Sequence, residues 1–226
     1  MSPEPDQERS SACGVGLTAL SEVPLLPHNR EVLDRCQRDC QGPEAWRRRK
    51  LADARDVLAL SQIAPRLAVI HLDLGHSIRL LADLRVTVPC MPRPEGELFI
   101  ARRALLGVTY GQEALTTPQS GLSFVEILQP PRVWHANVLP KPGQPLCLGP
   151  RLPAGIPLVE VILMTYGALT MQTWMLDPED SAGLANPAAA RWWLANRERL
   201  IPLSTEPFIL RGDGTRSTAQ DEGVRQ

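Results

Sequence analysis

The chain has 226 residues, 43% of them hydrophobic, and a formal net charge of −1. This length suits one domain with tails or two small domains, and the near-neutral charge gives no reason to expect nucleic acid or a membrane surface as a partner. No apolar run approaches the roughly 18 residues of a spanning helix, and the polar, acidic N-terminus lacks the pattern of a secretory signal.

The first half of the chain is predicted to form helices followed by strands. Residues 1–28 are polar and rich in proline and serine, which indicates a disordered or loosely docked segment. Apolar spacing predicts helices over 30–40 and 43–64. Alternation and strand-forming residues predict strands over 67–74, 77–88, 98–100 and 122–128, whereas residues 102–121 show no clear pattern.

The second half is predicted to be a long loop followed by two helices. The loop spans 135–157, and the all-round apolar stretch 158–174 indicates a buried helix. The pair Asn186-Pro187 is a typical helix start, with an N-cap asparagine before a proline in the first turn. Residues 211–226 are polar and predicted to be a disordered tail. We therefore expect one α+β domain over 29–210.

A histidine, an asparagine and a cysteine in the predicted loop could carry chemistry. Cys147 could act as a nucleophile at an acyl carbon, and the amide of Asn137 could donate a hydrogen bond to the resulting oxyanion. His135 could be a base or a structural clip. The competing interpretation makes Cys147 a small buried hydrophobe and His135 a structural loop residue. The five cysteines include no Cys-x-x-Cys pair, so we expect no zinc site, and reduced thiols in the cytoplasm.

The order of these motifs resembles that of ubiquitin-conjugating enzymes. Residues 135–138 (His-Ala-Asn-Val) and 146–148 (Leu-Cys-Leu) are similar to the family's His-Pro-Asn and Ile-Cys-Leu signatures. Residues 130–133 (Pro-Pro-Arg-Val) resemble the Pro-Pro-x-Val strand that precedes them, and 186–190 (Asn-Pro-Ala-Ala-Ala) resemble the opening of a later family helix. The resemblance covers about residues 43–200.

The resemblance implies the ubiquitin-conjugating (UBC) fold, with an N-terminal helix, an antiparallel β-meander and C-terminal helices. It implies that Cys147 accepts a ubiquitin-like modifier protein from an activating enzyme as a thioester, and passes it to an amine, a lysine for example, on a protein target. Asn137 would serve the oxyanion or order its loop, and His135 would give structural support. No metal or organic cofactor is needed for this chemistry.

Further residues have roles in the family that this chain could share. Asp177 and Asp180 lie where a downstream acid helps the attacking lysine, although turn formation and helix capping are the favoured explanation for both. The first family helix often meets the activating enzyme, and here it begins with a basic run that is otherwise a solvated face: Arg47, Arg48, Arg49 and Lys50.

The chain also departs from the family pattern. Ala136 replaces the proline of the signature, ten positions separate Asn137 from Cys147, and the tryptophan common after the cysteine is missing. These departures and the composition rich in Arg, Ala and Pro resemble bacterial versions found in ubiquitin-like conjugation operons, for which antiphage defence is one expected setting.

Three alternatives remain open from the sequence. The first is a non-catalytic variant of the same fold that binds modifier. The second is a cysteine hydrolase that pairs Cys147 with His135 or His71, which requires a histidine within hydrogen-bond reach of the thiol. The third is a scaffold protein in which the motif is a coincidence.

Overall fold

A computed structural model describes residues 17–91, 96–173 and 184–209. The helices are α1 (Pro27–Asp39), α2 (Glu44–Ile63), α3 (Leu158–Leu169) and α4 (Pro187–Leu200), with 3₁₀ turns η1 (Leu17–Glu22), η2 (Gln112–Leu115) and η3 (Gly121–Ser123). The strands are β1 (Leu67–Asp73), β2 (Ile78–Leu84), β3 (Val88–Cys90), β4 (Phe99–Ala101), β5 (Ala104–Tyr110), β6 (Val125–Gln129) and β7 (Pro145–Leu146).

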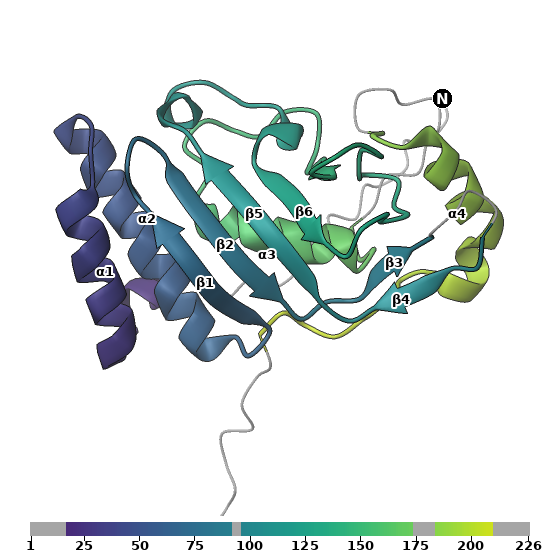
Figure 1. Ribbon diagram of the computed structural model, residues 1–226, viewed down its shortest axis with the longest axis horizontal. Coiled ribbons are helices and arrows are strands. Elements are labelled where there is room, and N and C mark those ends of the chain that lie inside the picture. Colours follow the sequence, from purple (N-terminus) through teal and green to yellow (C-terminus); the bar gives the residue numbers. More distant parts are fainter. Residues whose placement is uncertain (1–16, 92–95, 174–183, 210–226) are drawn as a thin grey trace, which may run out of the picture.

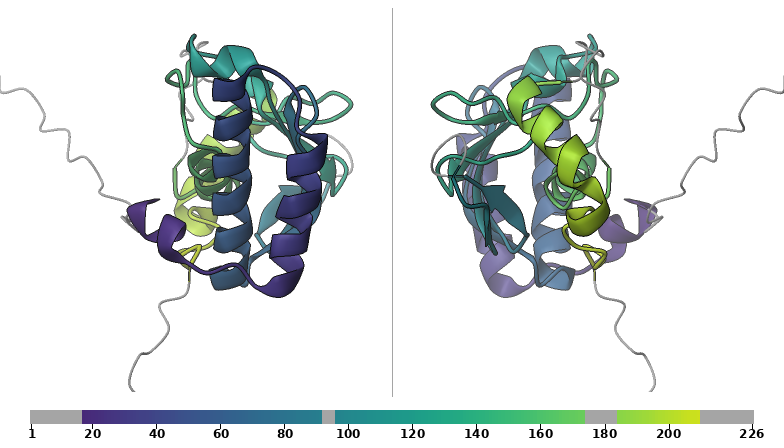
Figure 2. Two further views of the ribbon diagram at one scale, coloured as in Figure 1. Left: turned by 90° about the vertical axis from the view of Figure 1, so that its left-hand side faces the viewer. Right: turned by 90° about the vertical axis from the view of Figure 1, so that its right-hand side faces the viewer.

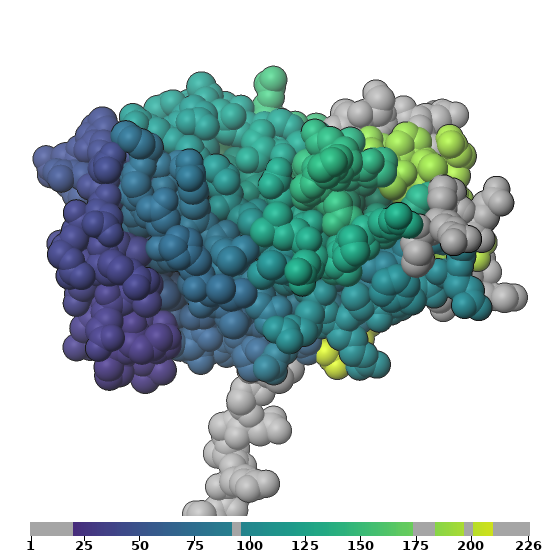
Figure 3. All heavy atoms as spheres, in the orientation of Figure 1, coloured from purple at the N-terminus to yellow at the C-terminus, as the bar shows by residue number. Residues whose placement is uncertain are grey.

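The strands form one antiparallel sheet and a separate hairpin. The sheet has the order β1-β2-β5-β6-β7, and β3 pairs only with β4. Helices α2 and α3 lie behind the sheet, and none of the labelled helices crosses its front (Figure 1). The space-filling view in the same orientation shows the residues of the strands at the surface, in blue to green (Figure 3). Side views place α1 and α2 next to each other at one end of the molecule and α4 at the other (Figure 2). The predicted α+β class is confirmed.

The strand predictions need two corrections. The stretch predicted as one strand over 77–88 ends at Leu84, and the chain leaves the sheet before it forms β3. The unassigned stretch 102–121 contains β5, which pairs with β2 on one side and β6 on the other. Its buried residues alternate as Ala104, Leu106, Val108 and Tyr110.

The helices agree more closely with the predictions. Helix α2 matches the predicted 43–64 within one residue at each end, and it stops where Pro65 keeps the preceding Ala64 out of the helical region. Helix α1 begins at Pro27, inside the segment predicted to be disordered or loosely docked. Helix α3 ends at Leu169, five residues earlier than predicted, with Thr170 as its C-cap.

Two side chains of α2 hold the segment that leads into α1. Arg55 donates hydrogen bonds to the carbonyls of Leu20, Ser21 and Val23. The Oε1 atom of Gln62 accepts from the backbone of Leu26 and from Asn29, and its Nε2 donates to Pro24. This part of the N-terminal segment is therefore docked on α2.

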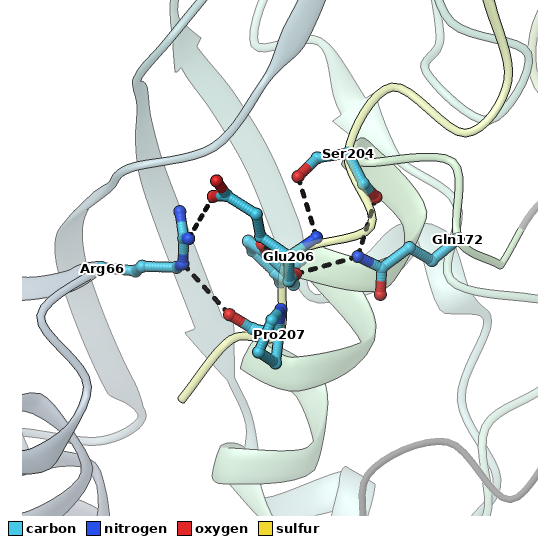
Figure 4. Close-up of polar contacts among 6 residues, drawn as sticks. Arg66, Gln172, Ser204, Glu206 and Pro207 are labelled. Carbon is cyan, nitrogen blue, oxygen red and sulfur yellow. Dashed lines mark hydrogen bonds and ion pairs between the residues drawn. The ribbon is translucent and has the colours of Figure 1, made fainter. Parts of the chain in front are cut away.

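The C-terminal part of the described chain returns across α3 to the end of α2. Arg66 pairs with the Glu206 carboxylate and donates to the carbonyl of Pro207 at 3.1 Å. From the other side, the amide of Gln172 donates to the carbonyls of Ser204 and Glu206 at 2.9 and 3.1 Å (Figure 4). Residues 204–207 are thus held between β1 and the end of α3.

Lys50 is fully buried in α2 and acts as an internal clamp. Its ammonium donates to the carbonyls of Gln41 and Leu74 at 2.7 and 2.6 Å, and also to that of Gly75. It lies over the ring of Trp46, 5.4 Å from the centroid. One cation therefore satisfies carbonyls of the α1–α2 and β1–β2 connections.

Among the described residues, none of the helices combines the length and apolar character needed to cross a membrane.

We predict that Lys50→Met lowers the free energy of unfolding by about 3–5 kcal/mol, because several buried carbonyls lose their donor. Arg48→Met is the matched control, since Arg48 is exposed in the same helix and surface changes cost about 0.5 kcal/mol. Urea denaturation measures both. Equal stability of the two variants would contradict the clamp.

Candidate active site

A backbone hydrogen bond joins Asn137 and Cys147 at the open end of a short hairpin. The amide of Cys147 donates to the carbonyl of Asn137 at 2.7 Å, and the amide of Leu139 donates to that of Pro145 at 2.9 Å. Val138 and Leu146 form the antiparallel bridge between these bonds. The hairpin loop is therefore 140–144, and it contains the positions that lengthen the Asn-to-Cys spacing.

The pairing joins the backbones of Asn137 and Cys147 at the point where the two arms stop being paired. Asn137 and Cys147 are the next residues beyond the Val138–Leu146 bridge on the two arms. The amide of Val138 donates to the carbonyl of His135 at 3.2 Å, so Asn137 lies in a turn, and its own amide donates to His135. A slip of one residue would pair Cys147 with a different residue, so the juxtaposition of Asn137 and Cys147 depends on the backbone pairing.

A second segment borders the cysteine strand on its other edge. The amide of Leu148 donates to the carbonyl of Gly121, and that of Gly121 donates to Gly149. The backbones approach so closely that a Cβ on Gly121 would lie 2.3 Å from the Gly149 carbonyl oxygen. Only glycine fits here, and its role could not be recognised from the sequence alone.

The His135 side chain holds the Asn137 loop in place through both of its ring nitrogens. Its Nδ1 accepts a hydrogen bond from the amide of Asn137 at 3.0 Å, and Nε2 lies 2.9 Å from the carbonyl of Ala168 in α3. An acceptor at Nδ1 requires the proton to sit on Nε2. Burial lowers the pKa of His135 to about 4, although the hydrogen bond to Ala168 acts in the opposite direction. The ring is therefore neutral near pH 7, with both nitrogens in use.

The neighbouring Ala136 ties the same loop to α4. Its carbonyl accepts from the amides of Ala185 and Asn186, and its side chain is buried in a small cluster with Met171, Ala189, Ala190 and Trp193. The Asn186 side chain caps α4 through the amide of Ala189 at 3.1 Å. Both motifs singled out in the sequence, around 135–138 and 186–190, are thus joined in space.

Cys147 is almost enclosed. Its exposed fraction is 5%, and its Sγ lies 3.5 Å from the Gly149 carbonyl oxygen. Asn137 and Leu148 are each 8% exposed. The thiol is a free cysteine, but an acyl donor can reach it only after local movement of its surroundings.

Two of the other described cysteines, Cys36 and Cys90, are buried where thiolate formation is suppressed. Burial raises the pKa of Cys90 to about 11 and also raises that of Cys36. Cys36 and Cys40 belong to α1 and its C-cap. In the described ranges, no three His, Cys, Asp or Glu side chains cluster closely enough to hold a metal ion.

The basic run at the start of α2 divides between surface and interior. Arg47 and Arg48 are exposed. Arg49 pairs with Asp53 at 2.7 Å and donates to the carbonyls of Gly155 and Ile156, whereas Lys50 is the clamp described above. The four residues therefore do not form one surface, and a docking role is restricted to Arg47 and Arg48.

Asp53 connects α2 to the helix that follows the cysteine loop. Its Oδ1 accepts from the amide of Leu158, the first residue of α3, at 3.2 Å. Burial raises the pKa of Asp53, and the hydrogen bonds from Arg49 and Leu158 act in the opposite direction. Sequence analysis missed this link, because nothing in the spacing relates position 53 to position 158. Asp177 and Asp180 lie outside the described residues.

No family model, curated protein or solved structure matches the chain. The site itself consists of Cys147 and Asn137, joined through their backbones, and the neutral imidazole of His135.

We predict that the protein loses up to about 3 kcal/mol of stability between pH 6.5 and 4, because the unfolded histidine binds a proton in this range and buried His135 does not. Folding then favours the neutral form, so stability is complete above the unfolded pKa and falls with pH. Urea denaturation of wild type and His135→Asn at both ends of this range measures the effect. The variant should lack this component of the pH dependence, and an unchanged dependence would contradict the buried neutral ring.

Proposed function

We propose that the chain is a ubiquitin-conjugating-type acyltransferase with a UBC fold, in which Cys147 carries a ubiquitin-like modifier as a thioester. The observation that carries this proposal is the hairpin in which a backbone hydrogen bond joins Cys147 to Asn137. The element order also supports it, since a helix precedes an antiparallel sheet, the cysteine hairpin follows, and two helices close the chain.

The proposed reaction consists of two acyl transfers through Cys147. The Cys147 thiolate attacks the thioester carbonyl of the modifier on its activating enzyme, and the enzyme's thiolate leaves. An amine of the target then attacks the Cys147 thioester, which expels the Cys147 thiolate and loses a proton as the amide forms. The energy comes from the activating enzyme's use of ATP, so this chain needs no cofactor of its own.

Asn137 is suited to the second step. Each tetrahedral intermediate bears an oxyanion next to the cysteine sulfur, and the carboxamide of an adjacent residue can donate a hydrogen bond to it. His135 fixes the backbone of Asn137 through its amide. The imidazole thus acts on the geometry of Asn137 and takes no part in proton transfer.

The positions of the four histidines argue against a cysteine hydrolase. His135 has both ring nitrogens engaged. His28 lies in α1, His71 in β1 and His76 in the turn before β2, and three strands separate β1 from β7, which leads to Cys147. No histidine of this chain is placed to activate the thiol.

One observation favours the non-catalytic alternative, a module that binds modifier without forming a thioester. Cys147 is 5% exposed, which is typical of a packing cysteine as much as of a guarded nucleophile. The two readings differ in whether the folded protein exposes the thiol during local opening.

We predict that wild type forms an adduct sensitive to reducing agent when mixed with an activating enzyme, a ubiquitin-like modifier and ATP, and that Cys147→Ala does not. Asn137→Ala should still load but should discharge to free lysine about 100–1000-fold more slowly, because one oxyanion donor is lost.

Replacing Arg47 and Arg48 with glutamate should slow loading if they meet the activating enzyme. Non-reducing gels follow all these reactions.

An activating enzyme that is itself charged provides the control. If it is charged and wild type still forms no adduct, the modifier-binding module becomes the better account. Loading that does not change after the arginine replacements removes their docking role and leaves the thioester unaffected.

A further inference from the structure

Gln144 has a backbone conformation that its residue type rarely adopts. Its φ is +44°, in the left-handed region, where a side chain crowds its own backbone unless other interactions compensate. The residue is the last of the hairpin loop and lies three positions before Cys147.

Both N–H groups of the Gln144 carboxamide donate hydrogen bonds, and its oxygen accepts one. Oε1 accepts from the amide of Val133 at 2.7 Å. Nε2 donates to the carbonyls of Ile127 and Pro130, both at 2.8 Å. The Gln144 backbone carbonyl also accepts from the amide of Ile127 at 3.2 Å. The strained residue is therefore tied to the end of β6 and to the turn that follows.

These bonds join the arm of the hairpin that leads to Asn137 and the arm that leads to Cys147. The turn continues from Val133 through Trp134 to His135, which accepts a hydrogen bond from the amide of Asn137. On the other arm, Gln144 leads into β7 and Cys147, and β7 itself pairs with β6 through only Val125 and Glu126. With so short a strand, the Gln144 side chain is a main link between the cysteine arm and the sheet.

The Gln144 side chain and its hydrogen bonds, called the clip from here on, also border the surface beside the hairpin. A hollow of about 740 Å³ lies between β6, the turn 131–134 and the loop 140–144, with Gln144 in its lining. Cys147 is absent from that lining. Gln144 thus lines the hollow, whereas Cys147, three positions further along the chain, does not.

We propose that Gln144 is a positioning residue, whose side chain holds the hairpin in the register that joins Cys147 to Asn137. The inference rests on the proposed function for its catalytic consequence. Its structural consequence, a closed and correctly aligned Cys147, stands independently. Transfer rates respond to displacements of about 1 Å at a reacting group, so loosening the hairpin affects chemistry before it unfolds the domain.

The matched control is Gln62. Its carboxamide also accepts from a backbone amide and donates to a backbone carbonyl, but it does so on α2 beside the N-terminal segment. Gln62→Ala therefore removes comparable hydrogen bonds away from the hairpin. Gln144→Gly removes the clip while relieving the backbone strain, and Gln144→Ala removes the clip and keeps the strain.

The first measurement is alkylation of folded protein by iodoacetamide, with Cys147 modification quantified by peptide mapping. We expect both Gln144 variants to react at least about tenfold faster than wild type, because losing the clip makes opening of the hairpin easier. Gln62→Ala should stay within about twofold of wild type. Equal reactivity of Gln144→Gly and wild type, or an equal rise in Gln62→Ala, would overturn the positioning role.

The second measurement is discharge of the loaded thioester to lysine. Both Gln144 variants should discharge about tenfold more slowly although their thiol is more accessible, because alignment with Asn137 is lost. A purely structural residue would not move alkylation and discharge in opposite directions. If wild type forms no thioester, the proposed function fails, and alkylation alone decides the positioning role.

Discussion

The backbone hydrogen bond from Cys147 to Asn137 is the constraint on which the candidate site depends. It fixes the register of the hairpin, and the register decides which residues of the two arms lie side by side. His135 holds the Asn137 side of this pair and the Gly121 backbone holds the Cys147 side. Cys147 and Asn137 are placed by backbone pairing, which the side chains of His135 and Gln144 support.

Helix α2 gives this hairpin a rigid base. Asp53 meets the first turn of α3, Arg49 holds the loop before it, and Lys50 ties down the turn between β1 and β2. Helix α3 in turn supplies the carbonyl of Ala168 to His135. A continuous set of buried polar contacts therefore runs from α2 through α3 to the Asn137 loop. Each of these contacts is directional, so the site inherits the geometry of the helices behind the sheet.

The sequence predicted the elements whose pattern is local. Helix α2 and the start of α4 have clear boundaries at Pro43, Pro65 and Pro187, and the structure places both as predicted. Strand β5 was missed because Leu105 and Gly107 interrupt the alternation on its outer face, and its identity as a strand comes from pairing with β2 and β6. Propensity is weak evidence where partners on both sides decide the conformation.

The candidate site divides in the same way. Cys147, Asn137 and His135 stood out by residue type and order, whereas their register required the loop 140–144 to fold back. The burial of Lys50 could not be read from a run of four basic residues, since helical periodicity turns some of them inward. Gln144 and Gly121 carry no sequence signal, because their importance lies in backbone conformation and close approach.

The most direct test of the central claim is disulfide formation in an Asn137→Cys variant. Residues that lie side by side across paired antiparallel arms have Cα atoms about 4.5–5.5 Å apart, within the range that a disulfide spans. Mild oxidation followed by peptide mapping should show a bond between positions 137 and 147, and none between 138 and 147 in Val138→Cys, because Val138 pairs with Leu146 and is buried in the core. A bond in the second variant and none in the first would contradict the register, and with it the pairing of thiol and amide on which the proposed chemistry depends.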